Sequence, residues 1–183
     1  MALSSTVYHF DVQLSDVDRG VYEALSFRTA RHPSETQEYL VTRALAYCLE
    51  YTEGIAFSKG LADPDEPAIV IRDLTGVLHA WIEIGAPDAE RLHKASKASP
   101  RVVVYTHKDP LRLVQQLSSE RIHKAESIEI RAVDRALLAG LVERLDRRVA
   151  WELAASDGHL YLTVGGVTLD GAVERHSLTA PGR

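Results

Sequence analysis

The sequence predicts an α/β (α+β) domain with a mixed β-sheet, flanking helices and additional antiparallel strands at both ends of the chain. Three observations support this fold class. Near the N-terminus, apolar and polar residues alternate with a period of two, which is typical of strands with one buried face. Through the middle of the chain, strand-like and helix-like segments alternate, as they do around parallel strands. Short strand-like segments separated by glycine turns end the chain.

Length and composition favour an ordinary globular protein. The chain has 183 residues, so we expect residues 1–183 to form a single domain. Its net charge of −5 argues against a protein that binds nucleic acid through overall charge alone. The N-terminus lacks the pattern of a signal peptide, and no apolar run is long enough to cross a bilayer. We therefore expect a cytoplasmic protein without a membrane partner, in which Cys48 is a buried, inert thiol.

The N-terminal third predicts a β-hairpin followed by a helix. Apolar and polar residues alternate over residues 8–14, which predicts a first strand. After a polar turn, residues 21–30 are expected to form a second strand that pairs with the first. A helix is expected over residues 34–51, because Ser34 and Gln37 form a capping-box pattern. Gly54 is expected to end this helix.

The central segments predict a hairpin and a parallel crossover. A short strand is expected near residue 55, and residues 67–73 and 78–85 predict a hairpin around a turn at 74–76. Residues 87–99 predict a helix, with Pro87 in its first turn. The next strand, 101–107, is apolar on both faces, so the intervening helix implies a parallel connection.

The remaining segments predict two helices, an intervening strand and a terminal meander. Asp109 and Pro110 open a helix over residues 109–121, and a strand follows at 125–133. Asp134 is the expected cap of the last helix. Residues 149–178 then predict three strands joined by glycine turns at 157–158 and 165–166.

Glu83 is an unusual residue in an otherwise apolar strand. An ionised carboxylate is costly to bury unless it is paired, hydrogen-bonded or bound to a metal. Counting outward from the hairpin turn places Glu83 opposite Pro67, next to Asp65 and Glu66, and opposed strand residues lie about 5 Å apart. Asp65 or Glu66 is therefore expected to share a cation with Glu83, and Mg²⁺ favours such carboxylate oxygens.

A third acid is expected from the first long helix. At about 100° per residue, Glu38 lies in line with Val41 and Leu45, so we expect it to point inward near the helix start. Glu35 lies one step off this line. Simpler roles remain open for these acids: Glu83 can pair with Arg72, and the others can serve as helix-start or loop residues.

Several stretches of the chain resemble the YaeQ family of bacterial proteins. They are "MALSSTVY" at the start, "ARHPSETQE" (30–38), "DEP" (65–67), "WIEIGAPD" (81–88) and "RLHKA" (91–95). The resemblance covers essentially the whole chain. It implies a compact variant of the PD-(D/E)XK nuclease fold, which is restriction-endonuclease-like, with the active-site acids on a central hairpin.

The resemblance also implies roles for individual residues. Glu38, or Glu35 as an alternative, resembles the helix acid of the superfamily, while Asp65 and Glu83 resemble the two acids that bind Mg²⁺ or Mn²⁺. Gly85 occupies the position of the superfamily's lysine. The following helix offers Arg91 and Lys94 in its place, although the 100° rule places Lys94 away from the core face.

Arg31, His32 and Ser34 predict a second polar site. They precede a helix N-terminus, which is a natural site for an anion such as a nucleic-acid phosphate. The alternative is that His32 and Ser34 only cap and brace the helix.

The sequence thus leaves two functional hypotheses. The first is a metal-dependent phosphodiesterase of nuclease type, acting on DNA or RNA through Glu38, Asp65 and Glu83. The second is a catalytically inactive module for nucleic-acid or protein interaction, which Gly85 and the negative net charge favour.

Overall fold

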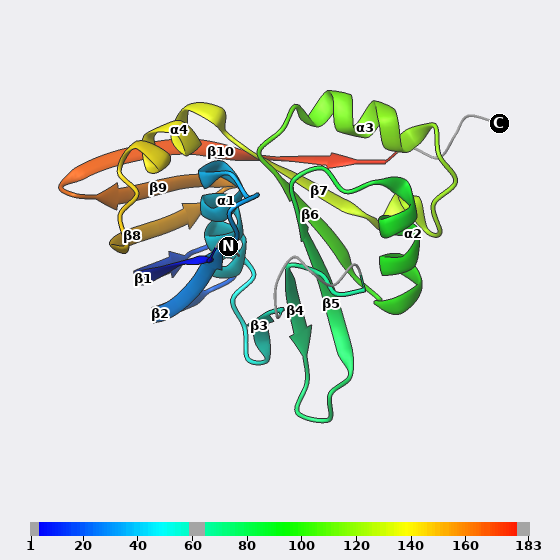
Figure 1. Cartoon of the computed structure of the whole chain (residues 1–183), viewed down its shortest axis with the longest axis horizontal. Helices are drawn as coiled ribbons and strands as arrows, with labels where there is room; N and C mark the ends of the chain where they lie inside the picture. The colour runs from blue at the N-terminus through cyan, green and yellow to red at the C-terminus, as the bar shows by residue number, and fades with distance from the viewer. Residues whose placement is uncertain (1–3, 59–64, 179–183) are drawn as a thin grey trace. The chain divides into compact units, whose positions relative to one another are not determined.

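The structure is a computed structural model that describes residues 4–58 and 65–178. Strands make up 43% and helices 26% of these residues. The chain divides into two compact units, which are described separately below (Figure 1). None of the helices within the described ranges is both long and apolar enough to cross a membrane. The first unit comprises Met1–Leu49 and Val133–Glu174, and the second comprises Glu50–Ala132 and Arg175–Arg183.

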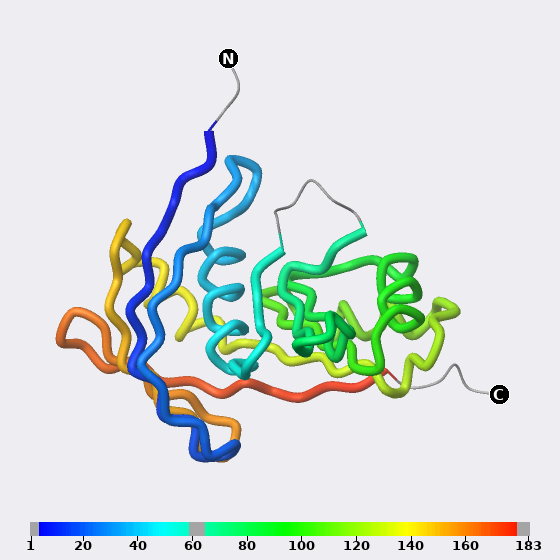
Figure 2. The backbone as a smooth tube through the Cα atoms, turned by 90° about the horizontal axis from the view of Figure 1, so that it is seen from below, coloured from blue at the N-terminus to red at the C-terminus, as the bar shows by residue number. Residues whose placement is uncertain are grey.

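The first unit contains a sheet with the strand order β2-β1-β8-β9-β10. The long β1–β2 hairpin, blue in Figure 2, is antiparallel. Strands β1 and β8 are parallel, and β8, β9 and β10 form an antiparallel meander. The elements of this unit are β1 (Thr6–Asp16), β2 (Val21–Arg31), α1 (Gln37–Leu49), α4 (Arg135–Glu143), β8 (Arg148–Ser156), β9 (His159–Val164) and β10 (Val167–Ser177).

Alternation along β1 explains the core of the first unit. Phe10 is fully buried and stacks on Phe27 of β2 with ring centroids 5.4 Å apart. It meets Trp151 of β8 edge to face at 4.9 Å. Tyr47 of α1 contacts Phe27 at 4.6 Å, so the helix packs on this apolar face. Aromatic pairs of this geometry stabilise the sheet beyond the area that they bury.

The second unit contains strands in the order β10-β7-β6-β5-β4-β3, in which only the end of β10, from Arg175 on, belongs to it. Strands β5, β6 and β7 are parallel, whereas β3, β4 and β5 are antiparallel. The predicted hairpin and parallel crossover are therefore confirmed. Its elements are β3 (Ile55–Phe57), β4 (Ile69–Arg72), β5 (Leu78–Ile84), α2 (Ala89–Ala98), β6 (Val102–Thr106), α3 (Pro110–Ser118), η1 (Ala125–Ser127) and β7 (Glu129–Val133).

Helices α2 and α3 cover one face of this parallel sheet. The residues that pack there come from alternate positions of the strands and from the apolar stripes of both helices. Burying them in one cluster fixes α2 against β5 and β6, and thereby positions the polar residues of α2. The cluster comprises Trp81, Leu92, Ala95, Val102, Val104, Leu113, Leu117, Ile122, Ile128, Ile130 and Leu178.

Aspartate side chains begin three of the helices. Asp88 caps α2 by accepting a hydrogen bond from the Arg91 N–H, and Asp109 and Asp134 cap α3 and α4 as the sequence predicts. Helix α1 differs from its prediction, because it begins at Gln37 rather than at Ser34.

The restriction-endonuclease-like fold class is wrong. The prediction treated the terminal strands as additions to a central sheet flanked by helices. In the structure, β1, β2, β8, β9 and most of β10 form the whole sheet of the first unit, and strand outweighs helix. The physical reason is the length of these alternating segments: β1, β2 and β10 have 11 residues each, enough for an extensive sheet of their own.

Gly54 provides a test of the backbone packing in the second unit. Its φ of +87° lies in the region that favours glycine, and a Cβ atom there would lie 1.8 Å from the Arg72 carbonyl oxygen. Gly76 has a similar φ of +86° but nothing within 4 Å of its Cβ position. We expect Gly76→Ala to lower the free energy of unfolding by about 1–2 kcal/mol and Gly54→Ala by at least roughly twice as much. Urea denaturation measures both, and equal losses would contradict this packing.

Candidate functional site

Glu83 lies buried on β5 with two hydrogen-bond donors. Its Oε1 accepts from Trp81 Nε1 at 2.6 Å and from Arg91 Nε at 2.7 Å. Trp81 and Glu83 project to the same face of β5 because side chains alternate along a strand. That face is the one covered by α2, which contributes Arg91. Glu83, the single acid of this apolar strand, is therefore buried and has a cationic partner.

Helix α2 also contacts the loop that precedes the hairpin. Arg91 Nη2 donates to the Glu66 carbonyl oxygen at 2.6 Å, and Lys94 forms an ion pair with Asp65. Arg91 and Lys94 lie three residues apart, so they project from the same side of the helix. The structure thus brings Asp65, Glu66 and Glu83 to one side of α2. Of these side chains only Glu83 is well buried, whereas those of Lys94 and Asp65 are 52% and 68% exposed.

Burial dominates the electrostatics of Glu83. Removal of the carboxylate from water raises its pKa above the ordinary value of 4.5. The hydrogen bonds from Trp81 and Arg91 and the positive charge of Arg91 oppose this increase but do not cancel it. Trp81 and Arg91 together therefore stabilise the charged form of Glu83 in an apolar strand.

The hairpin register differs slightly from its prediction. Ile69 pairs with Ile82, so continuing the register places Ala68, rather than Pro67, opposite Glu83. A bulge between Ile71 and Arg72 produces the shift. The partner of Glu83 is Arg91 and not Arg72, whose Nη1 donates to the Gly76 carbonyl oxygen at the hairpin turn.

Gly85 has a backbone role at the position where a lysine is expected. It is buried, has a φ of +91°, and its N–H donates to the Tyr105 carbonyl oxygen at 2.8 Å. A lysine would rarely adopt this left-handed conformation. The chain therefore needs glycine at this turn, and the cation that contacts Glu83 is Arg91 of α2.

The inward orientation expected for Glu38 is wrong. Glu38 is exposed in the first turn of α1, because the helix begins only one residue before it. Glu38 belongs to the first unit, whereas Asp65 and Glu83 belong to the second. A site that joins Glu38 to these two acids stays a prediction.

Glu35, the alternative helix acid, is the buried one. Its carboxylate accepts from Arg43 Nη1 at 2.9 Å and from the His32 N–H at 3.0 Å. Arg43 Nη2 also donates to the Ala30 carbonyl oxygen at 2.6 Å. Glu35 thus connects the end of β2 to α1, which is a structural role.

The predicted anion site at residues 31–34 is internally hydrogen-bonded. His32 Nδ1 lies 2.7 Å from Ser34 Oγ, and Arg31 Nη1 donates to the Glu35 carbonyl oxygen at 2.7 Å. Ser34 does not cap α1. Instead, Thr36 Oγ1 accepts a hydrogen bond from the Tyr39 N–H at 3.1 Å. His32 and Ser34 therefore brace the turn before the helix, and phosphate binding there remains a prediction.

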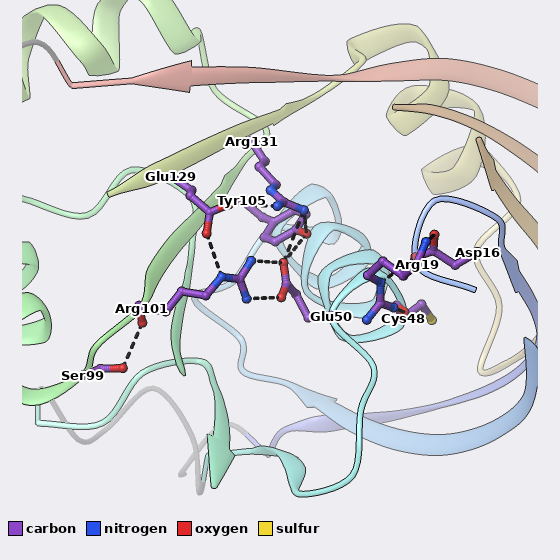
Figure 3. Close-up of polar contacts among 9 residues, drawn as sticks. All are labelled: Asp16, Arg19, Cys48, Glu50, Ser99, Arg101, Tyr105, Glu129 and Arg131. Atoms are coloured by element: carbon purple, nitrogen blue, oxygen red, sulfur yellow. Dashed lines mark hydrogen bonds and ion pairs between the residues drawn. The ribbon is translucent and has the colours of Figure 1, made fainter. Parts of the chain in front are cut away.

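A larger polar cluster, which the sequence reasoning missed, surrounds Glu50 (Figure 3). Arg101 donates to both Glu50 carboxylate oxygens, at 2.6 and 3.2 Å, and the Tyr105 hydroxyl donates at 2.7 Å. Arg131 lies 3.4 Å from Glu50 and binds Glu129 at 2.9 Å. Glu50 is buried, and both of its carboxylate oxygens accept hydrogen bonds from neighbouring side chains.

A signal for this cluster was present in the sequence. Glu129 and Arg131 are charged residues two positions apart in an apolar strand, so they share one face. The parallel register pairs Tyr105 of β6 with Arg131 of β7. The contribution of Glu50 was not visible, because it comes from a distant segment that was assigned to a helix.

The prediction for Cys48 is confirmed. Its side chain is fully buried in α1, and burial raises the pKa of the thiol. A thiol in this environment is a poor nucleophile and a poor metal ligand.

A metal site with several side-chain ligands is not apparent in the described ranges. No group of three or more His, Cys, Asp or Glu side chains lies close enough there to hold a metal ion together. The two acids that are predicted to bind the metal, Asp65 and Glu83, each form an ion pair with a residue of α2.

The raised pKa of Glu83 predicts a pH-dependent stability. The folded state binds this proton more tightly than the unfolded state, so stability falls as the pH rises from about the ordinary value of 4.5 to the higher folded-state value. Glu83→Gln removes this titration. We expect urea denaturation to show the wild type losing stability relative to Glu83→Gln across that window, while Glu90→Gln, an exposed acid of α2, follows the wild type. A constant difference between wild type and Glu83→Gln would contradict the assignment.

Comparison with known proteins places the chain in a family. A family model described as "YaeQ protein" matches residues 1–172. The chain is 32% identical over 165 residues to the uncharacterized protein YaeQ of Escherichia coli (strain K12), which covers 89% of this chain and 91% of that protein. The corresponding protein of Salmonella typhi is 30% identical over 164 residues, with the same coverage.

Two crystal structures of YaeQ proteins resemble the structure closely. The protein from Pseudomonas syringae superimposes with a TM-score of 0.84 at 34% identity, covering 96% of this chain and 97% of that one. The protein from Xanthomonas axonopodis pv. citri gives a TM-score of 0.82 at 28% identity, covering 97% of this chain and 100% of that one. With the family model and the relatives in agreement, the chain belongs to the YaeQ family.

Proposed function

We propose that this YaeQ-family protein is a metal-dependent phosphodiesterase that acts on nucleic acid. The observation that supports it is the meeting of Asp65, Glu83 and the Glu66 carbonyl with two cations, Arg91 and Lys94, beside the first turns of α2. Acid and carbonyl oxygens suit a hard divalent ion, and Arg and Lys suit phosphate. The proposal rests on this group of residues and not on a fold shared with restriction endonucleases.

We propose Mg²⁺ or Mn²⁺ as the ion. Mg²⁺ is commonly held by one or two carboxylates together with several waters. Both recorded hydrogen bonds of Glu83 go to Oε1, and no residue in the described ranges donates to Oε2. The Glu66 carbonyl oxygen lies within reach of the same guanidinium group as Glu83 Oε1. Glu83, Glu66 and Asp65 are the residues that would hold the ion.

The residues around the site have separate roles in the proposed reaction. Trp81 holds the Glu83 carboxylate in place through its indole N–H. Arg91 and Lys94 would bind the phosphate, and Arg91 offers the planar fork that matches two phosphate oxygens. A bound divalent ion supplies a more acidic water and neutralises charge on the phosphate.

A specific observation favours a second candidate function. Arg91 already pairs with Glu83, and the net charge of −5 weakens the general attraction for nucleic acid. In that case Arg91 and Glu83 form a structural pair, and the protein is a catalytically inactive module for nucleic-acid or protein interaction. Metal binding that depends on Glu83 distinguishes the two functions.

Isothermal titration with Mn²⁺ tests the proposed function. We expect the wild type to bind one Mn²⁺ and Glu83→Gln to bind it at least roughly tenfold more weakly, since a ligand oxygen loses its charge. Asp65→Asn should weaken binding as well. Glu90→Gln, which alters an exposed acid of the same helix, should bind like the wild type.

Cleavage assays then examine catalysis directly. Single-stranded and double-stranded DNA and RNA are incubated with Mn²⁺ and with each variant. Cleavage by the wild type that is lost in Glu83→Gln supports a phosphodiesterase. Absence of Glu83-dependent Mn²⁺ binding would overturn the proposal, and metal binding without cleavage of any of the four substrates would favour the inactive module.

A further inference from the structure

We propose that the exposed face of the sheet in the first unit binds the phosphate backbone of nucleic acid through Arg28 and Arg148. The inference deepens the proposed function, on which it rests for the class of ligand. Arg28 lies on β2 and Arg148 on β8, the two strands that flank β1 (Figure 1). Both arginines, and the residues of β1 between them, belong to the first unit.

The register of the sheet brings the two arginines into one row. His9 of β1 is the partner of Arg28 in the antiparallel pairing and of Arg148 in the parallel pairing. Residues that oppose each other in neighbouring strands project from the same face of a sheet. This face is the exposed one, because the alternate residues of β1, such as Tyr8 and Phe10, are buried. Neighbouring strands lie about 4.8 Å apart, so the backbones that carry the two arginines are about 10 Å apart.

Acceptors on β1 orient both guanidinium groups. Arg28 Nε donates to His9 Nε2 at 3.1 Å, and Arg148 Nε donates to Asp11 Oδ2 at 3.1 Å. A guanidinium nitrogen can only donate, so His9 Nε2 carries no proton in this arrangement. Within the described ranges, these are the hydrogen bonds that the two arginine side chains make. The Nη1 and Nη2 groups of each arginine therefore remain for a further acceptor.

Asp11 is itself held by the hairpin. Its Oδ1 accepts a hydrogen bond from Ser26 Oγ of β2 at 2.8 Å. This hydrogen bond and the nearby charge of Arg148 lower the pKa of the Asp11 carboxyl, so Asp11 stays ionised and continues to orient Arg148. Glu152, the acid of β8, lies four residues, or about 13 Å, beyond Arg148. One acid thus faces two arginines at this end of the sheet, which leaves a positive charge there.

The row of arginines suits the phosphates of nucleic acid. The planar fork of an arginine matches two oxygens of a phosphate group. The Arg148 side chain is 72% exposed, and the neighbouring residues Ser26, Ala30 and Ala150 on the same face are small, so a ligand backbone can approach. Nucleic acid carries phosphates at regular intervals, whereas a single free phosphate would engage only one of two forks about 10 Å apart.

Fluorescence anisotropy with labelled single-stranded and double-stranded DNA and RNA oligonucleotides tests this surface, in EDTA so that no cleavage contributes. We expect the wild type to bind at least one of these probes, and Arg28→Gln and Arg148→Gln each to weaken that binding roughly five- to tenfold at low salt. Each change should also reduce the slope of log K against log salt by about 1. Arg135→Gln removes the same charge from an exposed position of α4 in the same unit and should bind like the wild type.

Arg28→Lys and Arg148→Lys separate the contribution of charge from that of the fork. Both retain the charge, so the salt slope should stay near that of the wild type while the affinity falls roughly two- to threefold. Circular dichroism verifies that each of these surface variants is folded.

Three outcomes would overturn the surface. They are unchanged nucleic-acid binding in Arg28→Gln and Arg148→Gln, an equal loss in Arg135→Gln, and arginine-dependent binding of poly-glutamate by a wild type that binds none of the oligonucleotides. The proposed function would stand in each case, because its test is Glu83-dependent binding of Mn²⁺. Conversely, absence of that Mn²⁺ binding beside Arg28-dependent binding of nucleic acid would overturn the phosphodiesterase and support the surface.

Discussion

In the second unit, burial of the Glu83 carboxylate on β5 is the constraint that determines which groups surround this strand. A charge in an apolar strand has to be compensated, and the sheet itself provides only the Trp81 indole. The remaining compensation comes from α2, whose position is fixed by Leu92 and Ala95 in the core. The same helix side then reaches the loop at Asp65 and Glu66. Burial of Glu83 thus connects strand, helix and loop in one polar arrangement.

Three buried acids of this protein illustrate how structural and functional carboxylates can be distinguished. Glu35 and Glu50 receive donors on both oxygens, from Arg43 and His32 in one case and from Arg101 and Tyr105 in the other. These two acids are saturated by the protein. Glu83 differs, because both of its recorded hydrogen bonds go to one oxygen. It is therefore the buried acid with capacity for a further ligand.

The sequence was informative where the physical signal was local. Alternation identified the strands, and Asp109 and Asp134 identified two helix starts, because a cap acts within one turn. The burial of Glu83 could also be predicted locally, because it is a single acid in an apolar strand. Its partner could not, since Arg91 reaches it from the next element and the choice between Arg91 and Arg72 depends on packing. The start of α1 was missed because Ser34 and Gln37 mimic a capping box.

The predicted fold class was wrong because the fold depends on contacts between distant parts of the chain. The strand segments were recognised, but their assembly depends on pairings between distant parts of the chain, such as β1 with β8. No local pattern encodes that parallel pairing. The cluster around Glu50 was missed for the same reason, since Glu50 and Arg101 are separated by 51 positions. The prediction for Glu38 was wrong for another reason. The apolar face of the helix was assumed to continue into its first turn, where Glu38 is exposed to solvent.

A crystal structure grown with Mn²⁺ tests the central claim most directly, because anomalous scattering locates the ion independently of any activity. The account predicts an Mn²⁺ ion bound to Glu83 and to the neighbouring loop at Asp65 and Glu66. A structure in which saturating Mn²⁺ leaves no ion at Glu83 would contradict it.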